Sequence, residues 1–318
     1  MAAALLSLTP YLRSGTELAR VRNALVFDAA PASAFDWSPD QAPASFLRDS
    51  RPPDAEFARV AASLELDRAP DDWARGVMIA DYLLASAPKL VGGAVQAGLH
   101  ETLHRITERG EGYCADFVRV FEALAVAGGL HTRAWAFSFD GYGGNGHVLP
   151  EIWNHQRGRW QVMDVFNNVY FAAADGQALD ALSLRAALDR GDTEVHARPL
   201  VPRARPGFVV DAKLHAYYLR GLDEWYLWWG NNPFDYDHAT ATLQGGALLR
   251  GLGQIGAVVR GVQPGAKAVI WPANAKERQG MQRLRLHLLA VASIVGLGVV
   301  MLLGLALPRR RAGAARVG

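Results

Sequence analysis

The clearest hydrophobic periodicity in the chain lies within residues 115–127. Apolar side chains recur there three and four positions apart, as on the buried face of a helix; they are Phe117, Val120, Phe121 and Leu124. The pair Gly128-Gly129 follows, and glycine is common just after the last turn of a helix. We therefore predict a buried helix over residues 115–127, with Cys114 at its N-terminus.

Three short apolar runs follow this helix and have the composition of strands. They cover residues 132–139, 147–153 and 160–165, and the segment 154–159 between the last two is rich in turn-forming residues. The pattern predicts one helix followed by an antiparallel meander.

The rest of the chain is less regular. Helical spacing predicts further helices over three ranges: 72–84, 91–107 and 179–188. Residues 27–70 contain six prolines, which break long helices, so we expect an irregular wrap there. Residues 217–236 are dense in aromatic side chains. Such a density usually marks core, and a surface that stacks a sugar or peptide is the alternative.

Residues 288–307 form an uninterrupted run of twenty residues without a charged side chain. At 1.5 Å per residue, a helix of this length measures about 30 Å, the thickness of the hydrocarbon core of a bilayer. Arg283 and Arg285 precede the run and Arg309-Arg310-Arg311 follows it, which suits lipid headgroups on both sides. We predict one transmembrane helix over residues 286–307 and contact with the lipid bilayer through that single C-terminal helix.

Composition narrows the class of protein further. Half of the 318 residues are hydrophobic, so a sizeable core can form. The 33 Lys and Arg nearly balance the 31 Asp and Glu, and we expect no nucleic-acid partner. Cys114 is the single cysteine, which excludes an intramolecular disulfide framework and a multi-thiolate metal site. We expect no cofactor and no resident metal.

Three residues could carry cysteine chemistry. A thiolate is the nucleophile in such chemistry, and a helix N-terminus together with an adjacent imidazolium favours it at Cys114. His147 opens one predicted strand and Asp164 closes the next, 17 residues later. Pairing of those strands would bring the carboxylate beside the imidazole and fix its tautomer. Nucleophile, base and orienting acid thus follow in order.

Four stretches of sequence carry a resemblance to a known family. They are Gly112–Phe117, Leu124–Arg133, Gly146–Trp153 and Gly158–Asp164. Together they resemble the core of the transglutaminase-like superfamily, which belongs to the wider papain-like group. The resemblance covers about 55 residues, from Gly112 to Val165.

This resemblance implies an α+β fold with a papain-like, transglutaminase-like core, in which the nucleophile helix packs on an antiparallel sheet. It implies a catalytic triad of Cys114, His147 and Asp164 that attacks amide carbonyls, with transfer to an amine or hydrolysis as the outcome. The substrate would be a protein or peptide amide, including glutamine. Pro150 departs from the family pattern, and because proline cannot donate to a ladder, it predicts an edge strand.

The predicted organisation has five parts. They are an N-terminal helix with a Pro-rich wrap (1–75), a transglutaminase-like core (76–200), an aromatic-rich part (201–285), the transmembrane helix (286–307) and a basic tail (308–318). The chain would be a bacterial-type enzyme of the inner (cell) membrane. Because Met1–Leu8 lacks the features of an export signal, we expect the soluble body to face the cytoplasm.

Two other functions compete with this interpretation. His100-Glu101-Thr102-Leu103-His104 matches the H-E-x-x-H motif of zinc proteases, with Glu122 as a candidate third ligand. Its match is short, and glycines interrupt the chain soon after it. A catalytically inactive scaffold or binding protein at a membrane-bound envelope or polysaccharide system is the second alternative, since a fold does not specify an activity.

Overall fold

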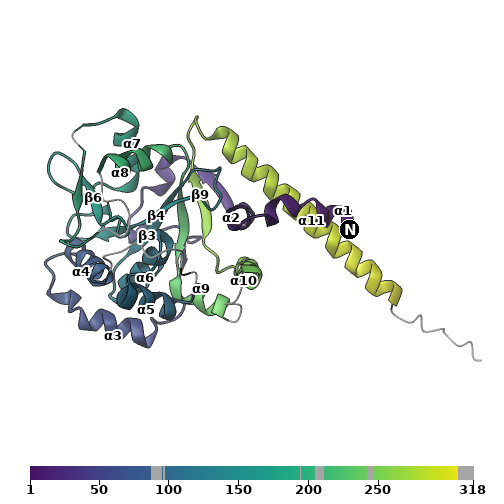
Figure 1. Ribbon diagram of the computed structural model, residues 1–318, viewed down its shortest axis with the longest axis horizontal. Coiled ribbons are helices and arrows are strands. Elements are labelled where there is room, and N and C mark those ends of the chain that lie inside the picture. The colour runs from purple at the N-terminus through teal and green to yellow at the C-terminus, as the bar shows by residue number, and fades with distance from the viewer. Residues whose placement is uncertain (87–94, 96, 194, 205–210, 242–246, 307–318) are drawn as a thin grey trace, which may run out of the picture.

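A seven-stranded mixed sheet runs through the body of the protein in the computed structural model (Figure 1). Six strands form the continuous order β1-β9-β8-β3-β4-β5, and β2 pairs with β8. Their bounds are β1 Phe27–Ala30, β2 Leu47–Arg48, β3 Thr132–Ser138, β4 Gly146–Asn154, β5 Arg159–Val162, β8 Trp225–Asn231 and β9 Gly265–Val269. A separate pair joins β6 (Val169–Ala172) to β7 (His196–Pro199).

The structure describes residues 1–86, 95, 97–193, 195–204, 211–241 and 247–306. Its α-helices are α1 Ala2–Leu6, α2 Gly15–Leu25, α3 Ala55–Ser63, α4 Asp72–Leu84, α5 Leu99–Arg109, α6 Cys114–Ala127, α7 Ala181–Arg190, α8 Asp211–Arg220, α9 Pro233–Thr240, α10 Ala247–Val259 and α11 Ala275–Ala306. Short 3-10 turns occupy Thr9–Leu12, Ala32–Phe35, Pro39–Gln41 and Leu66–Arg68. The predicted basic tail (308–318) lies outside the described residues.

The central helix forms where the periodicity predicts it. Helix α6 packs against β3 and β4, and α3, α4 and α5 surround it. Its apolar stripe, with Phe117 and Phe121 fully buried, is the centre of one hydrophobic cluster. The predicted helices at 72–84 and 179–188 correspond to α4 and α7, and the described part of 91–107 overlaps α5, which ends two residues later at Arg109.

The predicted antiparallel meander is confirmed, but the sheet is larger than the prediction. Strands β3, β4 and β5 pair antiparallel in chain order. However, β1 pairs parallel with β9, and β2 pairs parallel with β8. Residues 27–70 are therefore more than an irregular wrap, since they supply two strands and the nine-residue helix α3. The aromatic stretch 217–236 contains the inner strand β8 and mostly fills the core.

Pro150 lies in β4 at a point where the strand has a ladder partner on one side only. It pairs with Ala134 of β3, and β4 lies between β3 and the edge strand β5. The ladder to β5 includes Glu151 but not Pro150, although the Pro150 carbonyl accepts from the Met163 N–H at 2.9 Å. The missing N–H therefore costs no ladder bond, because it faces the side on which β5 has ended. The prediction of an edge at this residue therefore holds locally, although β4 is an inner strand where β5 pairs with it.

A buried ion pair joins β3 to β4 on one face of the sheet. Arg133 and Glu151 are opposite each other, and both side chains are almost completely buried. Burial raises the pKa of Glu151 and lowers the pKa of Arg133, because each charge is removed from water. The opposite charges offset part of that cost. Trp135 Nε1 and the Ala181 N–H also donate to Glu151, at 2.8 and 2.7 Å.

The C-terminal helix is longer than the sequence pattern predicts. Helix α11 begins at Ala275 rather than near residue 286, and its first turns pack on α2 and β1. It is the one helix, within the part of the chain that the structure describes, that is long and apolar enough to cross a membrane. Its most apolar window has a mean hydropathy of 2.5 and is 11% buried. The helix projects beyond the body (Figure 1).

We expect Glu151→Gln to destabilise the body strongly. Glutamine keeps the shape of the side chain but leaves the Arg133 guanidinium buried without its counter-charge, which costs about 3–5 kcal/mol. Thermal unfolding of the full chain in detergent measures the loss. Glu65→Gln is the matched control, because Glu65 pairs with Arg68 on the exposed surface and should matter little. Equal effects of the two variants would contradict the structural role of the buried pair.

Candidate active site

Cys114 is the first residue of α6, a helix of 14 residues. The residue is partly exposed, and its thiol takes part in no disulfide. The Asp116 carboxylate accepts the Tyr113 N–H at 2.9 Å, which caps the start of the helix. Gly112 just before has a φ of 126°, a conformation that favours glycine. The local sequence therefore starts a new helix directly after Gly112 and Tyr113. This start places the sulfur at the positive end of the helix dipole.

His147 is the second residue of β4, opposite Phe137 of β3. The histidine is 3% exposed, so its ring is held inside the protein. Its Nε2 atom lies 2.7 Å from Asp164 Oδ2. The Cys114 side chain lies close enough to the imidazole to contribute to the raised pKa of His147. Since Nε2 faces the carboxylate, Nδ1 is the ring nitrogen available to the sulfur.

Asp164 follows β5 and is fully buried. Its backbone pairs with Val169, which holds the residue at a tight turn. Three side chains donate to Oδ2: His147 Nε2 at 2.7 Å, Asn167 Nδ2 at 2.6 Å and the Tyr218 hydroxyl at 2.6 Å. The Asn167 N–H donates to Oδ1 at 3.0 Å. This number of donors keeps a buried carboxylate ionised.

The charges of the three residues support one another. Burial alone would raise the pKa of Asp164, but His147 and the hydrogen bonds lower it below its usual value. Burial alone would lower the pKa of His147, but the Asp164 carboxylate and the Cys114 sulfur raise it to about 10. The imidazole is therefore protonated at neutral pH, which places an imidazolium beside the sulfur.

Aromatic rings enclose the histidine on several sides. The ring centres of Phe137, Tyr217, Tyr218 and Phe166 lie 5.4, 5.5, 6.0 and 6.4 Å from that of His147. Tyr217 and Tyr218 come from α8, and the Tyr217 hydroxyl donates to the Gly146 carbonyl at 3.0 Å. These contacts restrict the imidazole to the orientation that faces Cys114 and Asp164.

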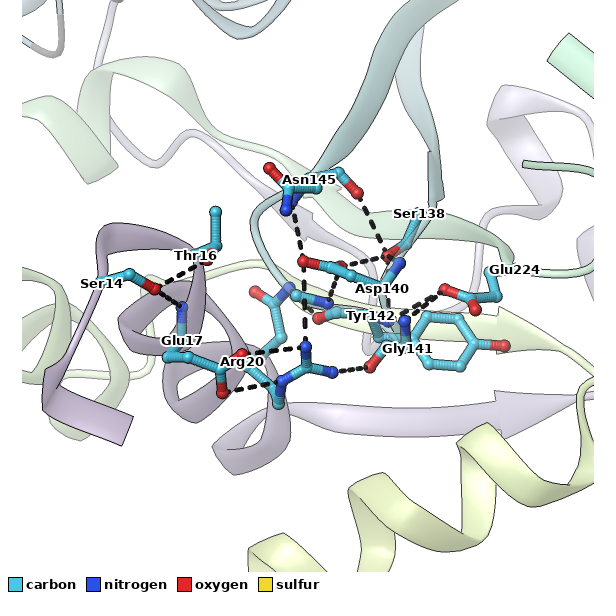
Figure 2. A network of polar contacts seen from close by, with 12 residues as sticks. Ser14, Thr16, Glu17, Arg20, Ser138, Asp140, Gly141, Tyr142, Asn145 and Glu224 are labelled. Atoms are coloured by element: carbon cyan, nitrogen blue, oxygen red, sulfur yellow. Dashed lines mark hydrogen bonds and ion pairs between the residues drawn. The ribbon is translucent and has the colours of Figure 1, made fainter. Parts of the chain in front are cut away.

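A second polar network fixes the loop that leads into His147 (Figure 2). Arg20 of α2 donates to the Gly141 carbonyl at 2.8 Å and lies 3.8 Å from the Asp140 carboxylate. Glu224 accepts the N–H groups of Gly141 and Tyr142, at 2.8 and 3.1 Å. Asp140 itself accepts the Gly143 N–H at 2.9 Å. Contacts from Arg20 of α2 and from Glu224, the residue before β8, thus fix the loop that leads into β4.

The H-E-x-x-H motif lies in α5, outside this site. His104 Nε2 is 3.0 Å from Glu56 of α3, and His100 contacts the same carboxylate. Glu122 is buried in α6, and among its neighbours is Asp49. Within the described ranges, no group of three His, Cys, Asp or Glu side chains is arranged to hold a metal ion. The arrangement of these side chains gives the zinc-protease alternative no support.

The structure brings Cys114, His147 and Asp164 together, and it adds partners that the sequence pattern did not indicate. Asn167 follows Asp164 by three residues, a spacing typical of side chains that share a turn. Tyr218 lies 54 residues from Asp164. Within the aromatic stretch no local signal separates it from the neighbouring core residues, so its contact depends on the tertiary fold.

We expect Tyr218→Phe to make the site sensitive to acid. The hydroxyl bond helps to lower the pKa of Asp164, so the stabilisation from this carboxylate is present above the ordinary value of 3.8 and is lost as the pH falls. Removing the hydroxyl raises the pKa of Asp164, and acid unfolding should begin at higher pH. Tryptophan fluorescence against pH measures the midpoint.

Tyr217→Phe is the control for this variant. It removes a hydroxyl from the adjacent ring while the Tyr218 bond to Asp164 stays in place. If both variants moved the acid midpoint equally, the effect would belong to packing in α8 and not to the carboxylate.

Comparison with known proteins adds little to this geometry. No protein-family model matches the chain, and no curated protein does. A candidate cysteine protease from Cytophaga hutchinsonii, solved by crystallography, aligns with 54% of this chain at 19% identity and a TM-score of 0.31. The aligned part covers 55% of that structure, about half of its length. A TM-score of this size does not establish a common fold.

Proposed function

We propose that this protein is a membrane-anchored, transglutaminase-like cysteine enzyme that acts on glutamine or peptide amides. The observation that carries the proposal is the arrangement around His147, whose imidazole lies 2.7 Å from the buried Asp164 carboxylate and whose pKa the nearby Cys114 sulfur helps to raise. A buried imidazolium between a carboxylate and a thiol at a helix N-terminus is suited to nucleophilic catalysis. The partial exposure of the residue is compatible with access of a substrate to this side chain.

The chemistry follows from the positions of these groups. The Cys114 thiolate attacks the amide carbonyl carbon, and the carbonyl π electrons move onto oxygen, where backbone N–H groups at the start of α6 can stabilise the charge. His147 then gives its proton to the departing amine or ammonia as the carbon–nitrogen bond breaks. An amine or water then attacks the resulting thioester and gives a proton back to His147, and the carbon–sulfur bond breaks so that Cys114 leaves as the thiolate. Asp164 holds the imidazole in one tautomer throughout.

Helix α11 supports a membrane anchor in the same proposal. Its apolar window is long enough to span a bilayer and is largely exposed. We further propose that the catalytic body faces the cytoplasm, because an unpaired reactive thiol persists in a reducing compartment. Protease added to intact spheroplasts should leave the body uncut, and digestion of the body from outside would reverse this orientation.

Alkylation of Cys114 tests the nucleophile. Because the chain has one cysteine, intact mass follows its reaction with iodoacetamide without peptide mapping. We expect the wild type to react readily near neutral pH, because the imidazolium of His147 favours the thiolate form, and His147→Ala to lose most of that reactivity. His131→Ala is a matched control, since His131 lies one residue before β3, outside the polar contacts described around Cys114. Equal reactivity of the wild type and His147→Ala near neutral pH would disprove the triad.

Turnover is measured separately from thiol reactivity. Incorporation of a labelled amine into a glutamine-containing protein reports transfer, and ammonia release without incorporation reports hydrolysis. Asp164→Asn should lower either rate by orders of magnitude, because an amide stabilises the wrong tautomer and no imidazolium. A reactive thiol without turnover on any amide tested would favour the inactive scaffold or binding protein over the enzyme.

A further inference from the structure

The N-terminal helix α1 lies along the outer part of α11. Ser7 Oγ is 3.0 Å from His287 Nε2. Near the other end of α1, the Met1 sulfur is so close to Gly298 that a Cβ there would lie 2.9 Å from it. The lower-numbered end of α1 therefore lies beside the higher-numbered part of α11, so the two helices are antiparallel. Figure 1 shows the N-terminal segment following α11 away from the body.

One face of α11 carries both contacts. Its less exposed side chains recur three and four residues apart; they are Met281, Leu284, Leu288, Val291, Val295 and Gly298. This is the spacing of a helix–helix seam. The first three belong to a hydrophobic cluster of the body that Leu8 also joins. Gly298, farther out, faces α1. The face of α11 that packs on the body therefore also packs on the N-terminal helix α1 farther out.

These contacts set the depth of α1 relative to the anchor. From His287 to Gly298 α11 rises eleven residues, or about 16 Å at 1.5 Å per residue. The hydrocarbon core of a bilayer is about 30 Å thick. If the uncharged run from Leu288 crosses that core, then α1 lies beside its first half.

The side chains of the N-terminal segment suit this environment. No charged side chain occurs before Arg13. Leu5 and Leu6 of α1 are 48% and 66% exposed, and Leu12 of the following 3-10 turn is 63% exposed, so this segment adds a further apolar surface beside α11. The Ser7 hydroxyl donates to the Ala4 carbonyl at 2.6 Å, and the Thr9 hydroxyl donates to the Leu6 carbonyl at 2.8 Å. Hydroxyls placed in hydrocarbon need such internal partners.

We propose that residues 1–6 insert into one leaflet of the bilayer beside α11, as a second membrane-embedded element. The partner of the exposed leucines is lipid acyl chain, because the apolar surface of α1 is continuous with that of the anchor. This inference rests on the proposed membrane anchor. The body would then be connected to the membrane-embedded elements at two points. One is the start of α11, and the other is α2, which follows the N-terminal segment. Two connections restrict rotation of the body more than one helix would.

Spin labels in the reconstituted full chain test the inference. In a Cys114→Ser background, single cysteines replace Ala2, Leu6, Leu297 and the exposed Ser63 of α3, and vesicles contain phosphatidylcholine and phosphatidylglycerol. Collisions with oxygen indicate lipid, and collisions with a nickel chelate indicate water. We expect the labels at residues 2, 6 and 297 to lose nickel collisions relative to the label at residue 63. The label at residue 2 should be about 6 Å deeper than the label at residue 6, four residues away at 1.5 Å each.

The other outcomes separate the two proposals. A label at residue 297 in lipid with labels at residues 2 and 6 in water would overturn the inference and leave the anchor intact. Equal depths at residues 2 and 6 would overturn it as well, because a helix lying flat at the interface gives no gradient. A label at residue 297 in water would refute the anchor, and the inference with it.

Discussion

An ionised carboxylate, Asp164, lies fully buried in the body, and the surrounding structure is arranged to satisfy its charge. An isolated carboxylate in such a place would become protonated instead. Donors from β4, from the turn after β5 and from α8 converge on its Oδ2 atom within 2.7 Å. These elements are far apart in sequence, so the charge is stable only when the sheet, the turn and α8 are all in place. The position of the His147 imidazole depends on the same condition.

The helix α2 connects this site to the long apolar helix α11. It packs against α11, and Arg20 and Asn23 on α2 donate to carbonyls of Gly141 and Tyr142, both at 2.8 Å. That loop leads directly into β4 and His147. The N-terminal region is thus part of the support of the site, although no residue before Cys114 is proposed to take part in chemistry.

Local sequence patterns predict the parts of the fold that local interactions determine. The stripe in α6, the hairpin of β4 and β5 and the apolar run of α11 are each visible within twenty residues or fewer. The spacing of His147 and Asp164 predicts their contact because one hairpin joins them. By contrast, the pairing of β1 with β9 joins residues 27–30 to 266–269, and no local periodicity encodes such a partner.

The same reason explains why the sequence pattern does not indicate Tyr218. Tyr218 reaches Asp164 across 54 residues, and its neighbours in sequence are aromatic residues of the core with no such role. Pro150 shows the opposite case, because its local chemistry predicts an edge and the ladder to β5 ends before the missing N–H would be needed. The type of a residue thus determines which partners it can have, and the tertiary fold determines which of these partners it contacts.

The central claim is that Asp164 and Cys114 keep His147 protonated inside the protein. NMR of ring-labelled histidine measures this directly, with the His147 signal assigned from a His147→Gln variant. The account predicts that the imidazole stays charged well above its usual pKa of 6.5 and deprotonates near pH 10, with Nε2–H bonded to the carboxylate throughout. In Cys114→Ser, the pKa of His147 should fall because the sulfur no longer contributes. A His147 that titrates near 6.5 in the wild type, with no change in Cys114→Ser, would contradict the account.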